Sequence, residues 1–424
     1  MDPHQTPHRS RRRPRMSDSH KRKHGDEEEL LQGTSVVTEQ ASSNQQMVVK
    51  KQRTEEEERA AAAQAQQQQL VAVNAASSQL IVGGANQAPP RTSSLQAATM
   101  QLTGHAAAVY AVRFSPSGRQ MVSAGGDKLA FLWDMAAEDG TPTGTCINSK
   151  LFTGHDGPIL DLAWTPGADQ IVTASTDKTA AQWDVESGAR IKRMRGHAGI
   201  VNAVGAARRG QPAFVTAGDD CSVLVWDPRS KHAVHTIKES YQVLSTSFSD
   251  DGSQVFSAGI SNDVKCYDLR TGRMVFDLIG HRDSVTGMAL SPDGSFLLTN
   301  GMDNTLRCWD VRPFVAGAGS SASAAASAGA SAAVIAGANR QTQLFKGHTH
   351  DLEQNLLRCA WSPDGLRVTG GSADKTVNVW EAATGRILYR LPGHKGSVND
   401  VAFHPFEPII ASASSDKTIF IGEL

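Results

Sequence analysis

The sequence predicts an all-β fold, a seven-bladed β-propeller, from three observations. First, a Trp-Asp-like pair recurs, and its aromatic positions are separated by 50, 43, 41, 42, 71 and 42 residues. A period of about 40–45 residues supplies four short strands to one propeller blade. Second, seven such positions occur, at residues 133, 183, 226, 267, 309, 380 and 422. Third, Gly-His pairs precede most units, at 104–105, 154–155, 196–197, 280–281, 347–348 and 393–394.

Within each unit the strands follow from local pattern, as the first unit shows. Residues 108–118 (AVYAVRFSPSG) alternate between apolar and polar side chains and end in a Pro/Gly turn. Residues 120–128 (QMVSAGGDK) predict a second strand that runs into a tight turn, and residues 129–134 (LAFLWD) predict a third. An outer strand then leads to the next Gly-His pair.

The two ends of the repeat region are both incomplete. The last unit ends on its third strand, residues 417–424 (KTIFIGEL), and has no outer strand. The first Gly-His pair follows an outer strand that has no blade of its own, near residues 96–103. We therefore expect this segment to complete the seventh blade and close the ring, since an unpaired edge strand is an aggregation hazard.

Residues 1–94 predict a disordered low-complexity tail, and 95–424 predict the propeller. The tail contains basic clusters, acidic runs and an Ala/Gln tract, with few large apolar residues. Its basic clusters between Arg9 and Arg53 are typical of nuclear import signals, although they also suit nucleic-acid contacts. The stretch 315–340 is rich in Ala, Gly and Ser and predicts a flexible insertion in the propeller. No secretory signal and no membrane span are expected.

Charge argues against broad nucleic-acid binding by the propeller. The chain has a net charge of −1, and residues 95–424 carry 29 Lys/Arg against 32 Asp/Glu. A protein that contacts many phosphates is usually basic. The five cysteines are scattered without a CxxC pair, which favours reduced thiols.

Four units repeat one polar set consisting of a histidine, a hydroxyl residue, an aspartate and a tryptophan. Any one set resembles the Ser-His-Asp arrangement of a hydrolase, but a hydrolase needs only one such site, beside a pocket. We therefore predict a structural role, in which indole, hydroxyl, imidazole and carboxylate form a chain of hydrogen bonds. The sets are His105, Ser123, Asp127, Trp133; His155, Thr173, Asp177, Trp183; His197, Thr216, Asp220, Trp226; and His281, Thr299, Asp303, Trp309.

Three units lack part of this set. The fourth has KESYQVL in place of Gly-His, with Ser261 and Tyr267 at the aspartate and tryptophan positions. The sixth has Gly370 at the hydroxyl position, and the seventh has Gly422 at the tryptophan position. We expect these blades to rely on apolar packing and strand pairing alone.

No motif predicts a catalytic, cofactor-binding or metal-binding residue. The sequence contains no HExxH, P-loop or nucleophile elbow. His348 and His350 form an HxH pair, but His348 belongs to a Gly-His pair, so a metal site there is not expected. We expect no enzyme activity, no cofactor and no small-molecule substrate.

The repeats identify the chain as a member of the WD40 family, most of whose members are scaffolds for other proteins. Three segments narrow the resemblance further: 89–105 (PPRTSSLQAATMQLTGH), 283–314 (DSVTGMALSPDGSFLLTNGMDNTLRCWDVRPF) and 406–424 (FEPIIASASSDKTIFIGEL). These resemble the WD-repeat subunits of the spliceosomal U5 small nuclear ribonucleoprotein. The resemblance implies a nuclear scaffold that takes part in pre-mRNA splicing. Its partners would be the large spliceosomal core protein and other U5 particle proteins, with little direct contact to nucleic acid.

The sequence offers two sets of candidate contact residues. Irregular loops suggest partner-binding residues at Tyr241, Gln242, Asp351, Leu352 and Glu353. An alternative function uses the WDxR-like segments at 226–229, 267–270 and 309–312. These resemble the signature of substrate receptors of cullin-RING ubiquitin ligases, which would make Arg229, Arg270 and Arg312 the ligase contacts.

Overall fold

The computed structural model describes residues 93–136, 142–313, 340–351 and 355–424, all of which fall within one compact unit of the chain, Ser77–Leu424. The predicted tail up to residue 92 and the insertion up to residue 339 lie outside these ranges. Among the described residues, no helix is long and apolar enough to cross a membrane.

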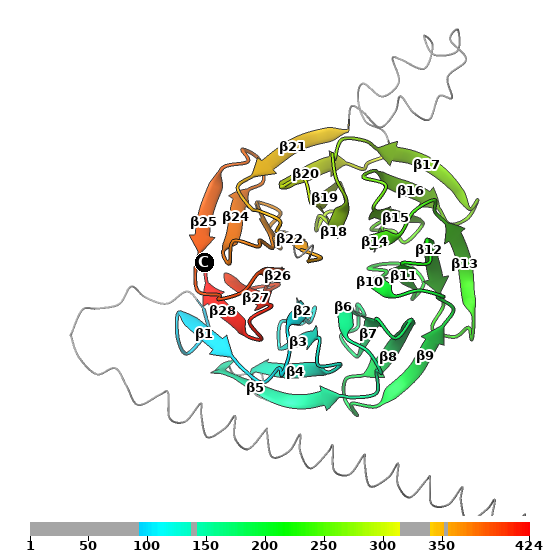
Figure 1. Ribbon diagram of the computed structural model, residues 1–424. Helices are drawn as coiled ribbons and strands as arrows, with labels where there is room; N and C mark the ends of the chain where they lie inside the picture. Colours follow the sequence, from blue (N-terminus) through cyan, green and yellow to red (C-terminus); the bar gives the residue numbers. More distant parts are fainter. Residues whose placement is uncertain (1–92, 137–141, 314–339, 352–354) are drawn as a thin grey trace, which may run out of the picture. The chain divides into compact units, whose positions relative to one another are not determined.

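The described chain folds into seven four-stranded antiparallel sheets arranged as the blades of a propeller, which confirms the predicted fold class (Figure 1). In each blade an inner strand lies nearest the axis and an outer strand lies at the rim. Blade 1 comprises β2 (Val109–Phe114), β3 (Gln120–Gly125), β4 (Ala130–Ala136) and β5 (Pro142–Phe152). Blade 2 comprises β6 (Ile159–Trp164), β7 (Gln170–Ser175), β8 (Thr179–Asp184) and β9 (Arg190–Arg195). Blade 3 comprises β10 (Val201–Ala206), β11 (Phe214–Gly218), β12 (Ser222–Trp226) and β13 (Ala233–Lys238).

The remaining blades repeat this order. Blade 4 comprises β14 (Val243–Phe248), β15 (Gln254–Gly259), β16 (Val264–Asp268) and β17 (Arg273–Leu278). Blade 5 comprises β18 (Val285–Leu290), β19 (Phe296–Gly301), β20 (Thr305–Asp310) and β21 (Gln341–Lys346). Blade 6 comprises β22 (Cys359–Trp361), β23 (Arg367–Gly370), β24 (Val377–Glu381) and β25 (Ile387–Leu391). Blade 7 comprises β26 (Val398–Phe403), β27 (Ile409–Ser414), β28 (Ile419–Glu423) and, from the other end of the chain, β1 (Thr99–Leu102).

The N-terminal strand closes the ring, as the unpaired ends of the repeat region predict. Strand β1 pairs antiparallel with β28, with Thr99 opposite Gly422 and Leu102 opposite Ile419. Gly422, which replaces the usual tryptophan, therefore lies beside the closing strand. Without β1, strand β28 would present a row of unpaired backbone groups, which is the edge that a propeller must avoid.

Three residues next to the predicted domain boundaries contact the propeller. Ser93 and Ser94 lie in the segment predicted as tail, yet both bond to carboxylates of blade 7. Arg340, the last residue of the predicted insertion, is buried, and its guanidinium carbon lies 4.2 Å from the centroid of the Phe276 ring. Neither position has a periodic pattern that would mark it in the sequence.

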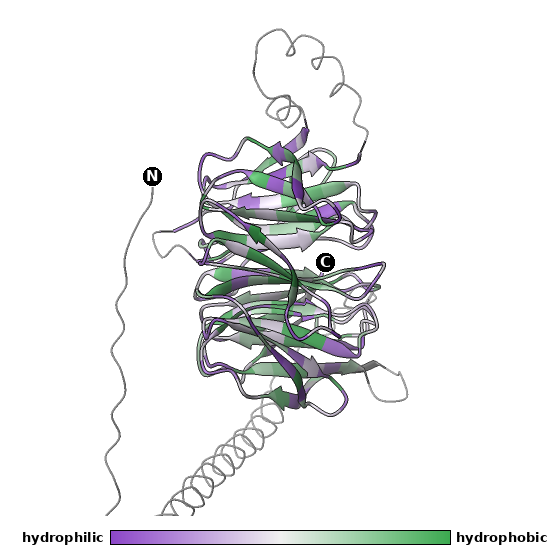
Figure 2. Cartoon of the chain, turned by 90° about the vertical axis from the view of Figure 1, so that its right-hand side faces the viewer, coloured by the Kyte–Doolittle hydropathy of each residue, from purple (hydrophilic) through white to green (hydrophobic). Residues whose placement is uncertain are grey.

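The core is divided among the seven blade interfaces. Each blade packs its apolar side chains against the next, and one such cluster joins Leu102 and Ile421 of blade 7 to Phe114 and Trp133 of blade 1. Figure 2 shows hydrophobic residues along the strands and hydrophilic residues in the turns at the two faces. Burial of these side chains is the main favourable term in holding the blades together.

The two faces of the disc carry different connections. One face carries the loops that join each outer strand to the next inner strand, together with the turns between second and third strands. We call it the Gly-His face. The opposite face carries the turns between first and second strands and those between third and fourth strands.

Candidate functional site

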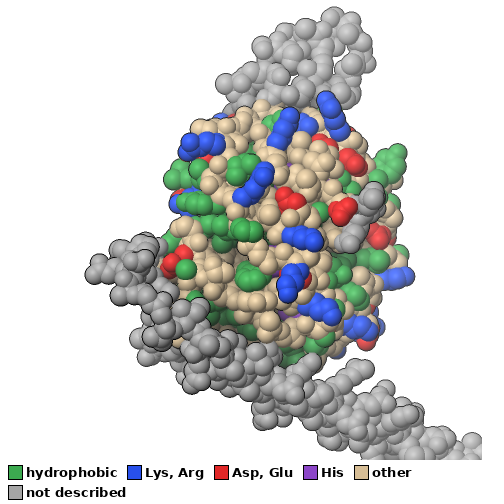
Figure 3. Space-filling view, turned by 60° about the vertical axis from the view of Figure 1, so that its left-hand side comes forward, with side chains coloured by type: hydrophobic (Ala, Val, Ile, Leu, Met, Phe, Trp, Pro, Cys, Tyr) green, Lys and Arg blue, Asp and Glu red, His purple; other side chains and the backbone are tan. Residues whose placement is uncertain are grey.

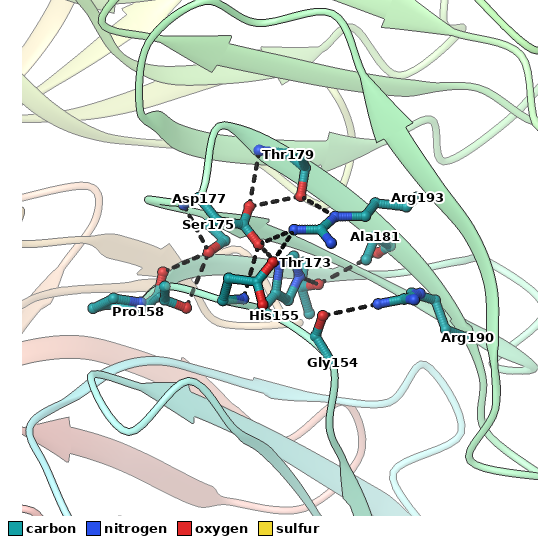
Figure 4. Close-up of polar contacts among 12 residues, drawn as sticks. Gly154, His155, Pro158, Thr173, Ser175, Asp177, Thr179, Ala181, Arg190 and Arg193 are labelled. Carbon is teal, nitrogen blue, oxygen red and sulfur yellow. Dashed lines mark hydrogen bonds and ion pairs between the residues drawn. The ribbon is translucent and has the colours of Figure 1, made fainter. Parts of the chain in front are cut away.

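The polar set of blade 2 shows how the repeated residues meet. His155 Nε2 lies 2.7 Å from Thr173 Oγ1, and His155 Nδ1 lies 2.8 Å from Asp177 Oδ2 (Figure 4). The indole N–H of Trp183 donates to the same hydroxyl oxygen at 2.9 Å. If the imidazole donates from Nδ1 to the carboxylate, the Thr173 hydroxyl donates to Nε2 and accepts from Trp183. Each buried polar atom then has a partner.

The protonation states fit this chain of bonds. Burial lowers the pKa of His155, so the imidazole is neutral at pH 7. Burial raises the pKa of Asp177, but hydrogen bonds from Thr179 and His155 outweigh burial and bring the pKa to about 2. The set therefore consists of a neutral imidazole against a carboxylate.

The other three complete sets repeat this geometry. The distance from imidazole Nε2 to the hydroxyl is 2.8 Å for His105, 2.8 Å for His197 and 2.7 Å for His281. The four hydroxyl residues are 0% exposed. A nucleophile must reach its substrate, and a hydroxyl with no exposed surface that already accepts an indole hydrogen bond is poorly placed for attack. The geometry supports the structural interpretation of all four sets, which stays a prediction until it is tested by substitution.

The turn aspartate also stabilises an unfavourable backbone conformation. In all seven blades the residue after the aspartate position has positive φ, and none of these residues is glycine: Lys128, Lys178, Cys221, Asn262, Asn304, Lys375 and Lys417. A left-handed conformation is costly for lysine and cysteine and less so for asparagine. Asp177 offsets part of this cost by accepting hydrogen bonds from the N–H and hydroxyl of Thr179, two residues on.

Blade 4 corrects the expectation that incomplete blades rely on apolar packing and strand pairing alone. Glu239 occupies the histidine position there, 18 residues before Ser257 and 28 before Tyr267. Its carboxylate accepts hydrogen bonds from Ser257 Oγ and Tyr267 Oη, both at 2.8 Å, and pairs with Lys265 Nζ at 2.5 Å. The signal was present in the sequence, because the same offsets of 18 and 28 residues separate His281 from Thr299 and Trp309.

Blade 6 departs from the expectation in another way. With Gly370 at the hydroxyl position, His348 Nε2 instead bonds Asn300 Oδ1 of blade 5 at 2.9 Å. The space at Gly370 is limited by Leu306, whose side chain would lie 3.1 Å from an added Cβ. The neighbouring His350 also reaches Asn300, at 3.2 Å. The hydrogen bonds of these two histidines therefore run between blades, whereas those of the histidines in the complete sets run within one blade.

The two histidines are held neutral by their surroundings. Burial and the neighbouring His350 lower the pKa of His348 to about 3, and burial lowers the pKa of His350 to about 4. No group of three or more His, Cys, Asp or Glu side chains that could hold a metal ion occurs in the described ranges.

Blade 7 retains most of the set despite Gly422. His394 bonds Ser412 at 2.8 Å and Asp416 at 3.1 Å. Phe420, two residues before the missing tryptophan, packs edge-on against the imidazole with ring centroids 4.6 Å apart. Phe131 makes the same contact with His105 in blade 1, which keeps its tryptophan, so the packing is shared by the two blades and the imidazole hydrogen bonds of blade 7 persist without the indole.

Arginines at the propeller axis form a cluster that the repeat pattern did not predict. Arg113 of blade 1 pairs with Asp400 of blade 7, and its second amino group lies 3.8 Å from Asp161 of blade 2. Arg358, at the start of blade 6, lies 3.4 Å from Asp161 and donates to the carbonyl of Asn202 in blade 3 at 2.6 Å. Arg113 therefore joins neighbouring blades, whereas Arg358 joins blades that are not neighbours in the ring.

A third arginine bridges blades near the opposite face. Arg208 follows the inner strand of blade 3, and its two amino groups donate to the carbonyls of Leu290 and Ser291 in blade 5, both at 2.7 Å. Blade 4 lies between these two blades. Arg208 and Arg358 therefore link blades that are not adjacent, and Arg113 links blade 1 to the blades on either side of it.

The predicted partner-binding residues do not form one surface. Tyr241 (59% exposed) and Gln242 lie in the loop that enters blade 4, where the carbonyl of Gln242 accepts the N–H of Ile260. Asp351 is exposed in the loop that enters blade 6, on the same Gly-His face but with blade 5 between. Leu352 and Glu353 lie outside the described residues.

The three WDxR arginines are exposed on the opposite face, each after a third strand. Arg229 and Arg312 pair with the aspartate of their own motif, Asp227 and Asp310. The backbone N–H of Arg270 bonds Asp268. Nothing in these contacts separates a ligase-binding role from an ordinary strand end.

Surface charges are mixed on the side of the propeller that Figure 3 presents. Lys and Arg side chains are interspersed with Asp and Glu side chains and with neutral surface. No continuous basic band of the kind that follows a phosphate backbone is visible on that side.

Comparison with known proteins agrees with the repeats. The family described as WD domain, G-beta repeat matches residues 97–134, 144–184, 188–227, 272–310, 339–381 and 385–421. The unmatched stretch between 227 and 272 contains most of blade 4, the blade with the Glu239 set.

Individual relatives match most of the chain. The U5 small nuclear ribonucleoprotein 40 kDa protein of Homo sapiens is 50% identical over 336 residues, which cover 79% of this chain and 86% of that protein. The protein of the same description from Dictyostelium discoideum is 38% identical over 335 residues, with the same coverage. The pre-mRNA-splicing factor cwf17 of Schizosaccharomyces pombe is 40% identical over 334 residues, covering 79% and 90% of the two chains.

Proposed function

This chain belongs to the WD40 family and, within it, to the family of the U5 small nuclear ribonucleoprotein 40 kDa protein, and we propose that it acts in pre-mRNA splicing as a non-catalytic scaffold of the U5 particle in the nucleus. Its partner in this proposal is the large spliceosomal core protein, together with other U5 particle proteins. The observation that carries the proposal is the 50% identity over 336 residues to a relative described as a U5 particle protein.

The geometry supports a scaffold role. The hydroxyl residues of the four complete His/hydroxyl/Asp/Trp sets are 0% exposed. The closing strand and the axial arginines hold the blades in fixed positions, so the surface loops are presented on a rigid frame. Binding residues on a rigid scaffold lose less conformational freedom on association, which favours protein binding.

In this proposal the propeller binds proteins and has little direct contact with RNA. The propeller residues from 95 onward carry more Asp and Glu than Lys and Arg. Neutralising many phosphates needs a basic surface, and affinity from this source falls steeply with salt. We expect the basic clusters between Arg9 and Arg53 to serve nuclear import.

A pull-down with the full chain tests the proposal. The immobilised chain should capture the large U5 core protein directly, and it should bind naked RNA weakly at physiological salt. Tyr241→Ser should weaken capture by roughly 5- to 30-fold if this tyrosine is a contact residue, the range of a 1–2 kcal/mol contact. Tyr389→Ser is the matched control, since Tyr389 is a second exposed tyrosine, at 40% exposure on β25 of blade 6.

The outcomes separate the candidate functions. Tight, salt-sensitive RNA binding without capture of the core protein would reject the scaffold assignment in favour of RNA recognition. Recovery of cullin-RING ligase subunits, lost in an Arg229→Ala, Arg270→Ala double variant, would favour the alternative function as a substrate receptor. These two arginines are exposed, which leaves that alternative physically open.

A further inference from the structure

Two serines that precede the closing strand β1 form hydrogen bonds with blade 7. The N–H of Ser94 donates to Glu407 Oε2 at 2.7 Å, and its hydroxyl donates to Glu407 Oε1 at 3.0 Å. The N–H of Ser93 donates to Glu423 Oε1 at 3.2 Å, and its hydroxyl bonds the same oxygen. Glu407 lies in the turn between β26 and β27, and Glu423 ends β28. Ser93 and Ser94 are therefore held by two carboxylates of blade 7 shortly before β1 begins.

These contacts depend on a hydroxyl that donates. Neither Glu407 nor Glu423 has a Lys, Arg or His side chain within ion-pair distance among the residues that the structure describes. A phosphoserine carries about −1.5 to −2 charges at pH 7, and its oxygens are acceptors. Phosphorylation of Ser94 would remove the hydroxyl donor and add negative charge beside the Glu407 carboxylate. Both changes weaken the contact between residue 94 and Glu407.

Ser94 also lies in a segment that a protein kinase can reach. Ser94 is half-buried, and β1 is a four-residue strand hydrogen-bonded on one side only, to β28. Short terminal strands of this kind open locally at lower cost than the body of a sheet. Arg91 stands three residues before Ser94, an arrangement that basophilic protein kinases accept through their substrate charge preferences.

We propose that Ser94 is a phosphorylation site and that its modification releases β1 from blade 7. A protein kinase transfers the γ-phosphoryl group of ATP to Ser94 Oγ. The new O–P bond forms as the bond to the β–γ bridging oxygen breaks, ADP leaves, and the hydroxyl proton passes to the kinase's base. Release of β1 then exposes the β28 edge, where another strand can pair. This step is independent of the partner named above.

A double-mutant cycle on the full chain tests the electrostatic argument. Ser94→Glu should increase amide hydrogen exchange in residues 99–102 about tenfold, equivalent to about 1.4 kcal/mol. It should also lower Tm by about 2–4 °C. Ser94→Ala should have a smaller effect, because it loses one hydrogen bond and adds no charge. In a Glu407→Gln background most of the extra effect of Ser94→Glu should disappear. Exchange in the strands of blade 3 provides the internal control and should not change.

Three results would overturn the proposal. One is an equal effect of Ser94→Glu with Glu407 and with Gln at that position. Another is an equal effect of Ser94→Glu and Ser94→Ala. The third comes from treating the full chain with a basophilic kinase and ATP, followed by mass spectrometry. Absence of phosphate on Ser94, or a phosphate there that leaves the exchange of β1 unchanged, contradicts the assignment.

Discussion

Replacing Asp177 by alanine isolates the contribution of one polar set to stability. The Asp177 carboxylate accepts hydrogen bonds from His155 Nδ1, from the N–H of Asp156 and from the N–H and hydroxyl of Thr179, and it pairs with Arg193. The variant loses all of these contacts at once.

The expected loss in the free energy of unfolding depends on which of these groups is buried. The His155 side chain is 1% exposed, so its N–H is left without a partner away from water, at about 1–3 kcal/mol. The turn at Lys178 loses its support, at about 1 kcal/mol more. The ion pair with Arg193 adds little, because that side chain is partly exposed. The free energy of unfolding should therefore fall by about 2–4 kcal/mol.

Blade 6 supplies a matched control. Asp374 occupies the same turn position and accepts hydrogen bonds from the N–H and hydroxyl of Thr376, but His348 bonds Asn300 instead. Asp374→Ala should therefore cost only about 1 kcal/mol. The assay is urea unfolding followed by far-UV circular dichroism, with comparison of midpoints at an unchanged m-value. Equal costs for the two variants would refute the view that the histidine bond is the stabilising element, and so would a fully stable Asp177→Ala.

Four further outcomes follow from the structure. Deleting 95–103 should lower Tm of the propeller, whereas deleting 1–88 should not, and equal melting curves would argue against ring closure by β1. The blade 6 histidine pair has pKa values of about 3 and about 4 when folded, below the unfolded value of about 6.5. Its contribution is therefore complete above about pH 6.5 and declines as pH falls toward 4, and His350→Gln should reduce this decline in urea midpoints. Glu239→Ala should cost about 1–3 kcal/mol by leaving two hydroxyls unpaired, and an unchanged urea midpoint would mean that blade 4 relies on packing after all. Arg358→Met should cost about 1–3 kcal/mol in urea unfolding, because the buried Asp161 carboxylate keeps only Arg113, at 3.8 Å, and the carbonyl of Asn202 loses this donor. A neutral result would show that the axial contacts of Arg358 add no stability.

The sequence alone determined the features that repeat within one unit. The number of blades, the closing strand and the four complete polar sets all followed from recurring spacings. Six blades fold from consecutive strands, and the incomplete seventh unit needs a strand from the other end of the chain. His155, Thr173 and Asp177 are separated by 18 and 4 residues, and that spacing brings them together in every blade that keeps it. The Glu239 set obeys the same spacing and was missed only because its residue types differ.

Tertiary structure alone decided the contacts that cross between blades. His348 finds Asn300 in the preceding blade, and Arg358 reaches the carbonyl of Asn202, 156 residues away. The spacing within one unit does not encode these pairs. The first needs two adjacent blades to pack together, and the second needs the ring to bring blades 3 and 6 close to a common axis. The fastening of Ser94 to Glu407 has the same origin, since residues 313 positions apart meet only because the two ends of the chain share one sheet.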